Sequence, residues 1–216
     1  MASRASSPRQ WEPRLPATSR GERPAGRLGL LGLLVVLGCA PGPALPVLGE
    51  VPAFRLTERS GDLFGSDDLR GRVWVADFIF TRCPDVCPAM TANMKRLEAH
   101  ASGPTLISFS VDPAHDDPTV LAGYADRHQA GPRWKFLTGG REAIAGLLKD
   151  GFHVAFGDGG PPEAPITHSD RMVLVDETLH IRGYYRGRDP DDLSRLEADL
   201  ARLAERPGTP AGGQHS

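Results

Sequence analysis

The sequence predicts an α/β fold in which a central mixed sheet carries helices on both faces. Two runs rich in β-branched and aromatic residues, 73–80 and 105–111, are typical of buried strands. Segments with helical spacing follow both runs, and two strand-like segments near the C-terminus are joined by a tight turn. Strands that alternate with helices in this way favour a sheet covered on both sides.

The first half of the pattern is organised around one apolar strand. Residues 54–57 and 63–64 are expected to be short strands, with Gly61 in the turn between them. Residues 73–80 form the expected central strand. Residues 84–100 are expected to be a helix, because Met90, Met94 and Leu97 recur at helical spacing. Pro88 is compatible with this helix only within its first turn.

The second half repeats the alternation and ends in a hairpin and a helix. We expect strands at 105–111, 134–137 and 153–156, helices at 118–129 and 141–150, a hairpin of 171–175 with 180–185, and a closing amphipathic helix at 191–204. Gly151 ends the second of these helices, and Asp176 and Glu177 mark the hairpin turn. Residues 51–206 are therefore expected to form one domain.

Cys83 and Cys87 lie where the central strand hands over to the helix, in the segment FTRCPDVCP. A helix start has free N–H groups and a partial positive charge, and both of these lower the pKa of a thiol, so thiolate is expected to form there near neutral pH. Residues i and i+4 of a helix point the same way, so the two sulfurs can chelate one metal ion. They could also close a disulfide, structural or redox-active, with less favourable geometry than a two-residue spacing provides.

Two thiolates suit Cu(I) and also zinc. A closed zinc site needs four protein ligands, but the third cysteine, Cys39, belongs to an N-terminal targeting segment. A further ligand would be a histidine, of which the chain has seven: His100, His115, His128, His153, His168, His180 and His215. His168 is the best placed, because it directly precedes a strong strand. In thioredoxin-like folds, which this order of elements resembles, that loop faces the start of the cysteine-bearing helix.

The chain resembles the Sco/SenC family of copper-binding proteins over roughly residues 51–204. The resemblance is carried by FTRCPDVCP at 80–88, SVDP at 110–113 with Asp116 and Pro118, LTG at 137–139, and the His168 loop before MVLV at 172–175. It implies a thioredoxin-like fold and Cys83, Cys87 and His168 as ligands of one copper ion, Cu(I) or Cu(II). Many members have an acidic residue just before the ligand histidine, where this chain has Thr167; Asp170 is a candidate substitute.

The resemblance also implies a function: a copper chaperone that delivers its ion to the binuclear copper site of cytochrome c oxidase. Such a protein binds and transfers, and is not an enzyme. Its expected partners are the copper-bearing oxidase subunit, other copper chaperones and thiol reductants.

Two enzymatic alternatives remain open from the residues. One is a thiol-disulfide oxidoreductase acting on client cysteines, including those of the same oxidase. The other is a thiol peroxidase, for which Thr81 and Arg82 adjoin Cys83 but not in that family's arrangement. His115 lies in an acidic loop and is expected to be solvated, and Met90 and Met94 are expected to pack in the core.

The termini differ in composition from the predicted domain. Residues 1–39 combine an Arg-rich stretch with an apolar run, which is typical of a signal sequence or membrane anchor, and Cys39 is a candidate for lipidation. A mitochondrial presequence is the weaker alternative. Residues 40–50 are expected to be a Pro/Gly-rich tether and 207–216 a disordered tail. The expected location is the periplasmic face of the bacterial inner membrane. The net charge of −2 does not favour nucleic-acid binding.

Overall fold

The computed structural model describes residues 44–84, 86–100, 103–158 and 166–205. Its contacts divide the chain into two units, Met1–Cys39 and Ala40–Ser216, and all described residues belong to the second. They form an eight-stranded sheet in the order β1-β10-β9-β4-β5-β6-β2-β3, together with a separate two-stranded sheet, β7-β8.

Three parallel strands form the centre of the large sheet: β4 (Trp74–Ile79), β5 (Thr105–Ser110) and β6 (Trp134–Thr138). All six residues of β4 are buried, so the expectation of a central strand there is confirmed. Parallel strands need long crossovers, and helices supply them here. The register pairs Ile79 with Ser110, so the carboxyl ends of β4 and β5 lie side by side.

The flanking strands are antiparallel. They are β9 (Arg171–Val175) beside β4, then β10 (His180–Arg186) and β1 (Gly49–Glu50) towards one edge, and β2 (Arg55–Glu58) and β3 (Leu63–Gly65) beside β6 at the other. The predicted hairpin of β9 and β10 is confirmed. The small sheet contains β7 (Phe156–Asp158) and β8 (Ile166–His168).

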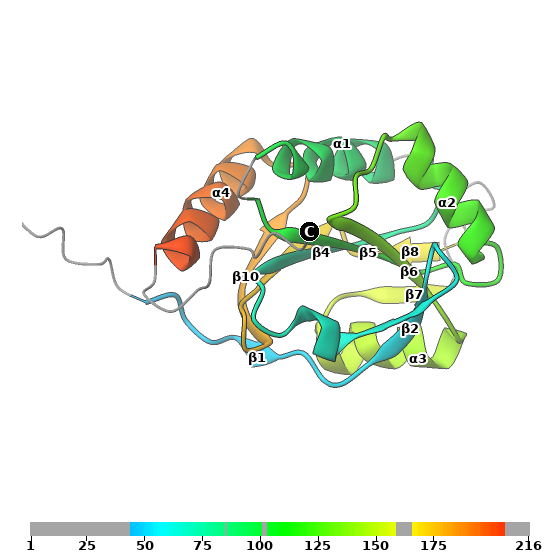
Figure 1. The fold of residues 1–216 in the computed structure, drawn as a ribbon, viewed down its shortest axis with the longest axis horizontal. Helices are drawn as coiled ribbons and strands as arrows, with labels where there is room; N and C mark the ends of the chain where they lie inside the picture. Colours follow the sequence, from blue (N-terminus) through cyan, green and yellow to red (C-terminus); the bar gives the residue numbers. More distant parts are fainter. Residues whose placement is uncertain (1–43, 85, 101–102, 159–165, 206–216) are drawn as a thin grey trace, which may run out of the picture. The chain divides into compact units, whose positions relative to one another are not determined.

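The helices cover both faces of the sheet, as expected (Figure 1). On one side lie α1 (Val86–Glu98), α2 (Pro118–Arg127) and α4 (Pro190–Ala204). On the other lies α3 (Arg141–Gly146), which continues into a π-helical turn at Leu147–Gly151. Asp117 caps α2 by accepting a hydrogen bond from the Val120 N–H at 2.8 Å. Among the described residues, no helix has both the length and the apolar character that a bilayer crossing requires.

Aromatic side chains fill the core between the central strands and the end of the α3 segment. Phe152 lies within 5.2–6.1 Å of the ring centres of Trp74, Phe78 and Phe109. All four residues are fully buried. This cluster packs β4 and β5 against the helix that follows β6. Such close packing keeps β4, which leads to the cysteines, in a fixed position.

Two segments differ from the expectations, and a third forms an element where the sequence predicted none. The strand expected at 153–156 begins only at Phe156, because His153 adopts a left-handed φ of 51° that interrupts an extended backbone. Ser66–Leu69 form a 3-10 helix, and β8 is a short strand where a loop was expected.

The expected tether of residues 40–50 is also shorter than the composition indicated. Leu45 is buried, its carbonyl accepts a hydrogen bond from Arg182 at 2.8 Å, and residues 49–50 pair with β10. Among the described residues, the folded part therefore already includes Leu45. The physical reason is that the exposed edge of β10 offers backbone hydrogen-bonding groups that an extended Pro-containing segment can satisfy.

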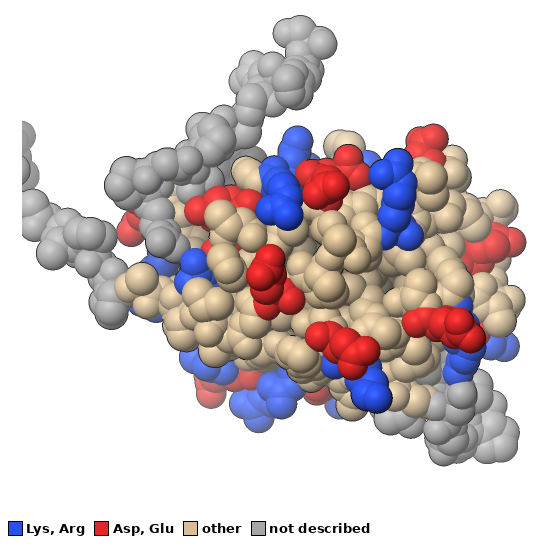
Figure 2. Space-filling view, turned by 90° about the horizontal axis from the view of Figure 1, so that it is seen from below, with Lys and Arg blue, Asp and Glu red and all other residues tan. Residues whose placement is uncertain are grey.

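The surface on the α3 side of the sheet carries both signs of charge (Figure 2). Acidic and basic side chains alternate over this face, with uncharged surface between them. A nucleic-acid-binding face would instead gather Lys and Arg into a stripe.

Candidate metal centre

The segment that carries the cysteines begins with a tight turn. β4 ends at Ile79, and the Cys83 N–H donates to the Phe80 carbonyl at 3.1 Å, which closes a turn over residues 80–83. The helix α1 then begins at Val86. Cys83 is half-buried in this turn, whereas Cys87 is buried within the first turn of the helix. The predicted position of the pair at a strand-to-helix junction is confirmed, and Pro88 lies in the first helical turn as required.

The two thiols are hydrogen-bonded to each other, and they differ in burial. The pKa of the Cys87 thiol is raised far above its ordinary value. The largest cause is a hydrogen bond to the Cys83 side chain, followed by burial; the buried carboxylate of Asp77 adds to the effect. All three favour the protonated thiol, because a thiolate at this position would be a buried charge beside another sulfur and near a carboxylate.

The expectation that a thiol at this helix start has a lowered pKa is therefore wrong for Cys87. A helix terminus contributes about 0.3–1 kcal/mol to a nearby charge, which is less than one pKa unit. Burial alone can shift a pKa by about 3–5 units in the opposite direction. Cys87 therefore keeps its proton until something replaces it, and a bound metal ion can do so.

A network of buried, hydrogen-bonded polar side chains connects the central strands near the dithiol. The carboxylate of Asp77 in β4 is fully buried and accepts a hydrogen bond from the Ser108 hydroxyl at 2.6 Å. The Trp134 Nε1–H donates to the same hydroxyl oxygen at 2.9 Å. This network therefore links β4, β5 and β6 close to Cys87. A buried carboxylate is stable only with such partners.

Two further carboxylates, from the loop after β5, hold the turn that carries Cys83. Asp116 accepts hydrogen bonds from the Thr81 N–H at 3.0 Å and the Thr81 hydroxyl at 2.6 Å. Asp112 accepts a hydrogen bond from the Arg82 guanidinium at 2.5 Å, and this raises the pKa of Arg82. The two loops meet because β4 and β5 are parallel neighbours that end together.

His168 is the last residue of β8, where its backbone pairs with Phe156. Its side chain lies outside the described residues. Two residues later, the Asp170 carbonyl accepts a hydrogen bond from Gly187 at 2.8 Å. Gly187 in turn lies against the Met90 side chain and accepts a hydrogen bond from Asn93, both on α1. Gly187 therefore connects the segment after His168 to the cysteine-bearing helix α1.

The other candidates lie apart from this pair. In the described part of the chain, no cluster of three His, Cys, Asp or Glu side chains has metal-binding geometry. His100, His115 and His153 are exposed, as expected for the solvated His115. The His128 pKa is lowered, first by burial and then by the charge of Arg127. Met90 and Met94 are fully buried, which confirms them as core residues. Cys39 lies outside the described residues, as does Asp85 beside the pair.

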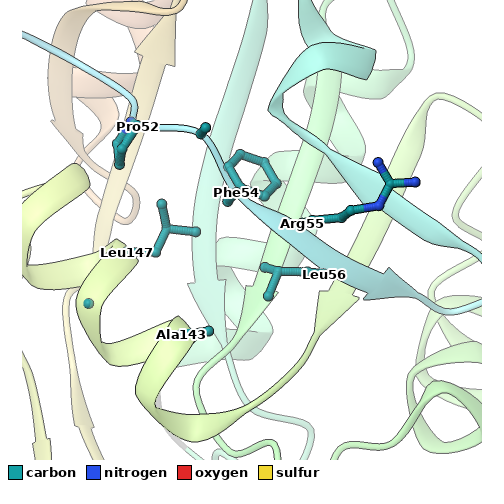
Figure 3. A pocket seen from close by; sticks show the side chains of 8 residues that line it. Pro52, Phe54, Arg55, Leu56, Ala143 and Leu147 are labelled. Atoms are coloured by element: carbon teal, nitrogen blue, oxygen red, sulfur yellow. The ribbon is translucent and has the colours of Figure 1, made fainter.

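The cavity in Figure 3 is chemically different from the cysteine site. It has a volume of about 360 Å³ and lies between residues 52–56 and α3. Its lining includes Phe54, Leu56 and Leu147, with Arg55 as the charged member. Its lining offers no thiol, imidazole or carboxylate, so this cavity has no metal-ligating group.

Sequence reasoning missed the roles of two aspartates. Asp77 interrupts the apolar run VWVADFIF, and a charged residue inside a buried strand is a usable signal. Asp116 was considered only as a member of the acidic loop around His115 and of the family resemblance, but it is fully buried. Its partner Thr81 lies 35 residues away, and only the pairing of β4 with β5 brings the two together.

Comparison with known proteins supplies independent information. A model of the SCO1/SenC family matches residues 48–205. The chain is 40% identical over 116 residues to the SCO1 protein homolog of Bacillus subtilis, a match that covers 50% of this chain and 60% of that protein. It is 30% identical over 167 residues to a protein of Stutzerimonas stutzeri that is named for copper binding, covering 74% of this chain and 80% of the relative.

A solved structure shows the same fold. BsSco, described as a member of the Sco family of cytochrome c oxidase assembly proteins and as containing a disulfide switch, aligns with a TM-score of 0.65. The alignment has 28% sequence identity and covers 76% of this chain and 99% of the BsSco chain. The expected thioredoxin-like fold is confirmed by this similarity.

Proposed function

The chain belongs to the SCO1/SenC family, and we propose that it is a copper chaperone which binds one copper ion through Cys83, Cys87 and His168 and delivers it to the binuclear copper site of cytochrome c oxidase. Proteins of this family are involved in copper binding and in cytochrome c oxidase assembly. The observation that carries the proposal is the contact between the Cys83 and Cys87 sulfurs at the β4–α1 junction.

The chemistry of the donors fits copper as the cargo. Two thiol sulfurs are soft ligands that select Cu(I), and an imidazole also accepts Cu(II). Binding displaces the proton that Cys87 holds so tightly, so loading releases protons to solvent. The ion thereby offsets the cost of a buried thiolate beside Asp77.

Transfer is supported by the asymmetry of the pair. Cys87 is buried while Cys83 is half-exposed, so an incoming or departing ion meets Cys83 first. Two thiolates and one imidazole leave a coordination position for a ligand of the acceptor protein. The protein would then act by binding and transfer and not as an enzyme.

The N-terminal sequence supports a proposal for the location of the chaperone. We propose that the domain is held at the periplasmic face of the inner membrane, by a lipid on Cys39 or by an N-terminal helix. Such an anchor would keep the dithiol close to a membrane-bound acceptor.

Copper loading tests the proposal. Purified, reduced protein is expected to retain about one equivalent of copper after gel filtration. Cys83→Ala, Cys87→Ala and His168→Ala are each expected to weaken binding, because each removes one ligand. His153→Ala is a matched control, since His153 is exposed and lies outside the cysteine segment. A parent protein that retains no copper, or a His168→Ala variant with unchanged affinity, would contradict the ligand set.

A further inference from the structure

The turn that carries Cys83 is held at both of its central residues. Residues 80–83 form the turn, Thr81 is bound by Asp116, and Arg82 is bound by Asp112. Both aspartates come from the loop after β5, and the Asp116 N–H donates to the Asp112 carbonyl at 2.9 Å. One short loop therefore binds both residues that precede Cys83. We call Asp112 and Asp116, with these contacts, the clamp.

Of the two aspartates, Asp116 makes the more extensive contacts with this turn and is the more deeply buried. Its side chain is fully buried and accepts three hydrogen bonds, from the Thr81 N–H, the Thr81 hydroxyl and, at 2.7 Å, the Ser110 hydroxyl. Arg82, by contrast, has a side chain that is 52% exposed. A fully buried carboxyl group with three donors is held firmly, because movement of any one donor leaves a buried acceptor site unsatisfied.

Ser110 connects the clamp to the sheet. Its hydroxyl donates to Asp116 and accepts from the Asp112 N–H at 3.1 Å, and its backbone pairs with Ile79 at the end of β4. The position of the Cys83 turn is thus fixed by its contacts with β5 and the loop after it, whereas Cys87 is positioned by α1. The contact between the two sulfurs depends on both supports.

We propose that Asp116 is the positioning residue of the metal centre, which acts through Thr81 to hold the Cys83 sulfur against that of Cys87. This inference deepens the proposed function, because it names the residue that sets the spacing of the two thiol ligands. Without the clamp, the Cys83 turn samples other conformations and the effective concentration of one sulfur near the other falls.

A reagent for paired thiols tests the clamp without copper and without His168. The probe is phenylarsine oxide, whose arsenic forms bonds to both sulfurs while its oxygen leaves as water with the two thiol protons. Its affinity for the reduced, metal-free protein therefore reports the spacing of the two thiols. Competition against dithiothreitol gives that affinity.

The variants separate positioning from general loosening. Thr81→Val and Asp116→Asn are expected to lower the affinity by about tenfold or more, the size expected for loss of a hydrogen bond to a charged group. Thr81→Ser keeps the hydroxyl and is expected to stay within about threefold of the parent. Thr178→Val is the matched control, since the Thr178 hydroxyl donates at 2.7 Å to the buried Asp176 in the β9–β10 turn. That turn follows Val175, which pairs with Trp74 at the end of β4 opposite to the cysteines.

The outcomes are distinct for the two proposals. Unchanged affinity in Thr81→Val, or an equal loss in Thr178→Val, overturns the positioning role of Asp116. If Asp116→Asn does not fold, the comparison of Thr81→Val with Thr81→Ser decides alone. A parent protein that binds the arsenical but no copper contradicts the copper function and leaves the clamp intact.

Discussion

At the scale of single residues, the two cysteines differ although the sequence makes them look equivalent. Cys83 is half-exposed in a turn, and Cys87 is buried with a raised pKa. Thiolate is the reactive form, so the exposure of Cys83 and the raised pKa of Cys87 both favour reaction at Cys83. The raised pKa of Cys87 also fixes the direction of its pH dependence. Folding stabilises the protonated thiol, so raising the pH through the ordinary thiol range forms little thiolate at Cys87.

Alkylation of the reduced, metal-free protein checks this asymmetry. At pH 8, iodoacetamide is expected to modify Cys83 at least about tenfold faster than Cys87. Peptide mass spectrometry of timed samples measures both rates. In urea-unfolded protein the two rates should converge, because the burial and the hydrogen bond are lost. Equal rates in the folded protein would show that the environments of the two thiols are alike.

At the scale of elements, the N-terminal segment belongs to the fold although its composition is that of a tether. The Leu48 N–H donates to Ile181 and the Val51 N–H to Leu179, both at 2.9 Å. Arg182 binds both the Leu45 carbonyl and the Asp176 carboxylate. These contacts close the outer edge of the sheet at β10, which would otherwise present unpaired backbone groups.

Two leucines in this segment test whether it is part of the cooperative fold. Leu45→Ala is expected to lower the free energy of unfolding by about 2 kcal/mol, because it empties a buried site. Leu48→Ala is expected to change it by less than about 0.5 kcal/mol, because Leu48 is 47% exposed. Urea denaturation of the two variants and the parent measures both values. Equal, negligible effects would mean that the segment is only a tether.

Local and non-local features of this chain were predictable to different degrees. The central strand could be predicted because every residue of β4 is buried and the run is almost wholly apolar. The dithiol could be located because its spacing and its place after a strand are local features. The support from Asp116 could not, since it depends on which strand lies beside β4. The protonation of Cys87 was mispredicted because burial depends on the whole fold, whereas a helix start is visible in the sequence.

At the scale of the whole molecule, the sheet order explains how the site is assembled. The parallel pairing of β4 and β5 brings the Cys83 turn beside the aspartates of the next loop. The antiparallel pairing of β9 with β4 directs the start of β9, and the segment after His168, towards the same end of the sheet. The cysteine segment, the aspartates that hold its turn and the segment after His168 are therefore three parts of the chain that the sheet order brings to the same end of the sheet.

Copper K-edge X-ray absorption on copper-loaded protein tests the central claim most directly, because it counts the ligand atoms around the ion. The account predicts two sulfur ligands and one imidazole nitrogen in the parent protein, one sulfur in Cys83→Ala, and loss of the imidazole signal in His168→Ala. A parent spectrum with fewer than two sulfurs, or an imidazole signal that persists in His168→Ala, would contradict it.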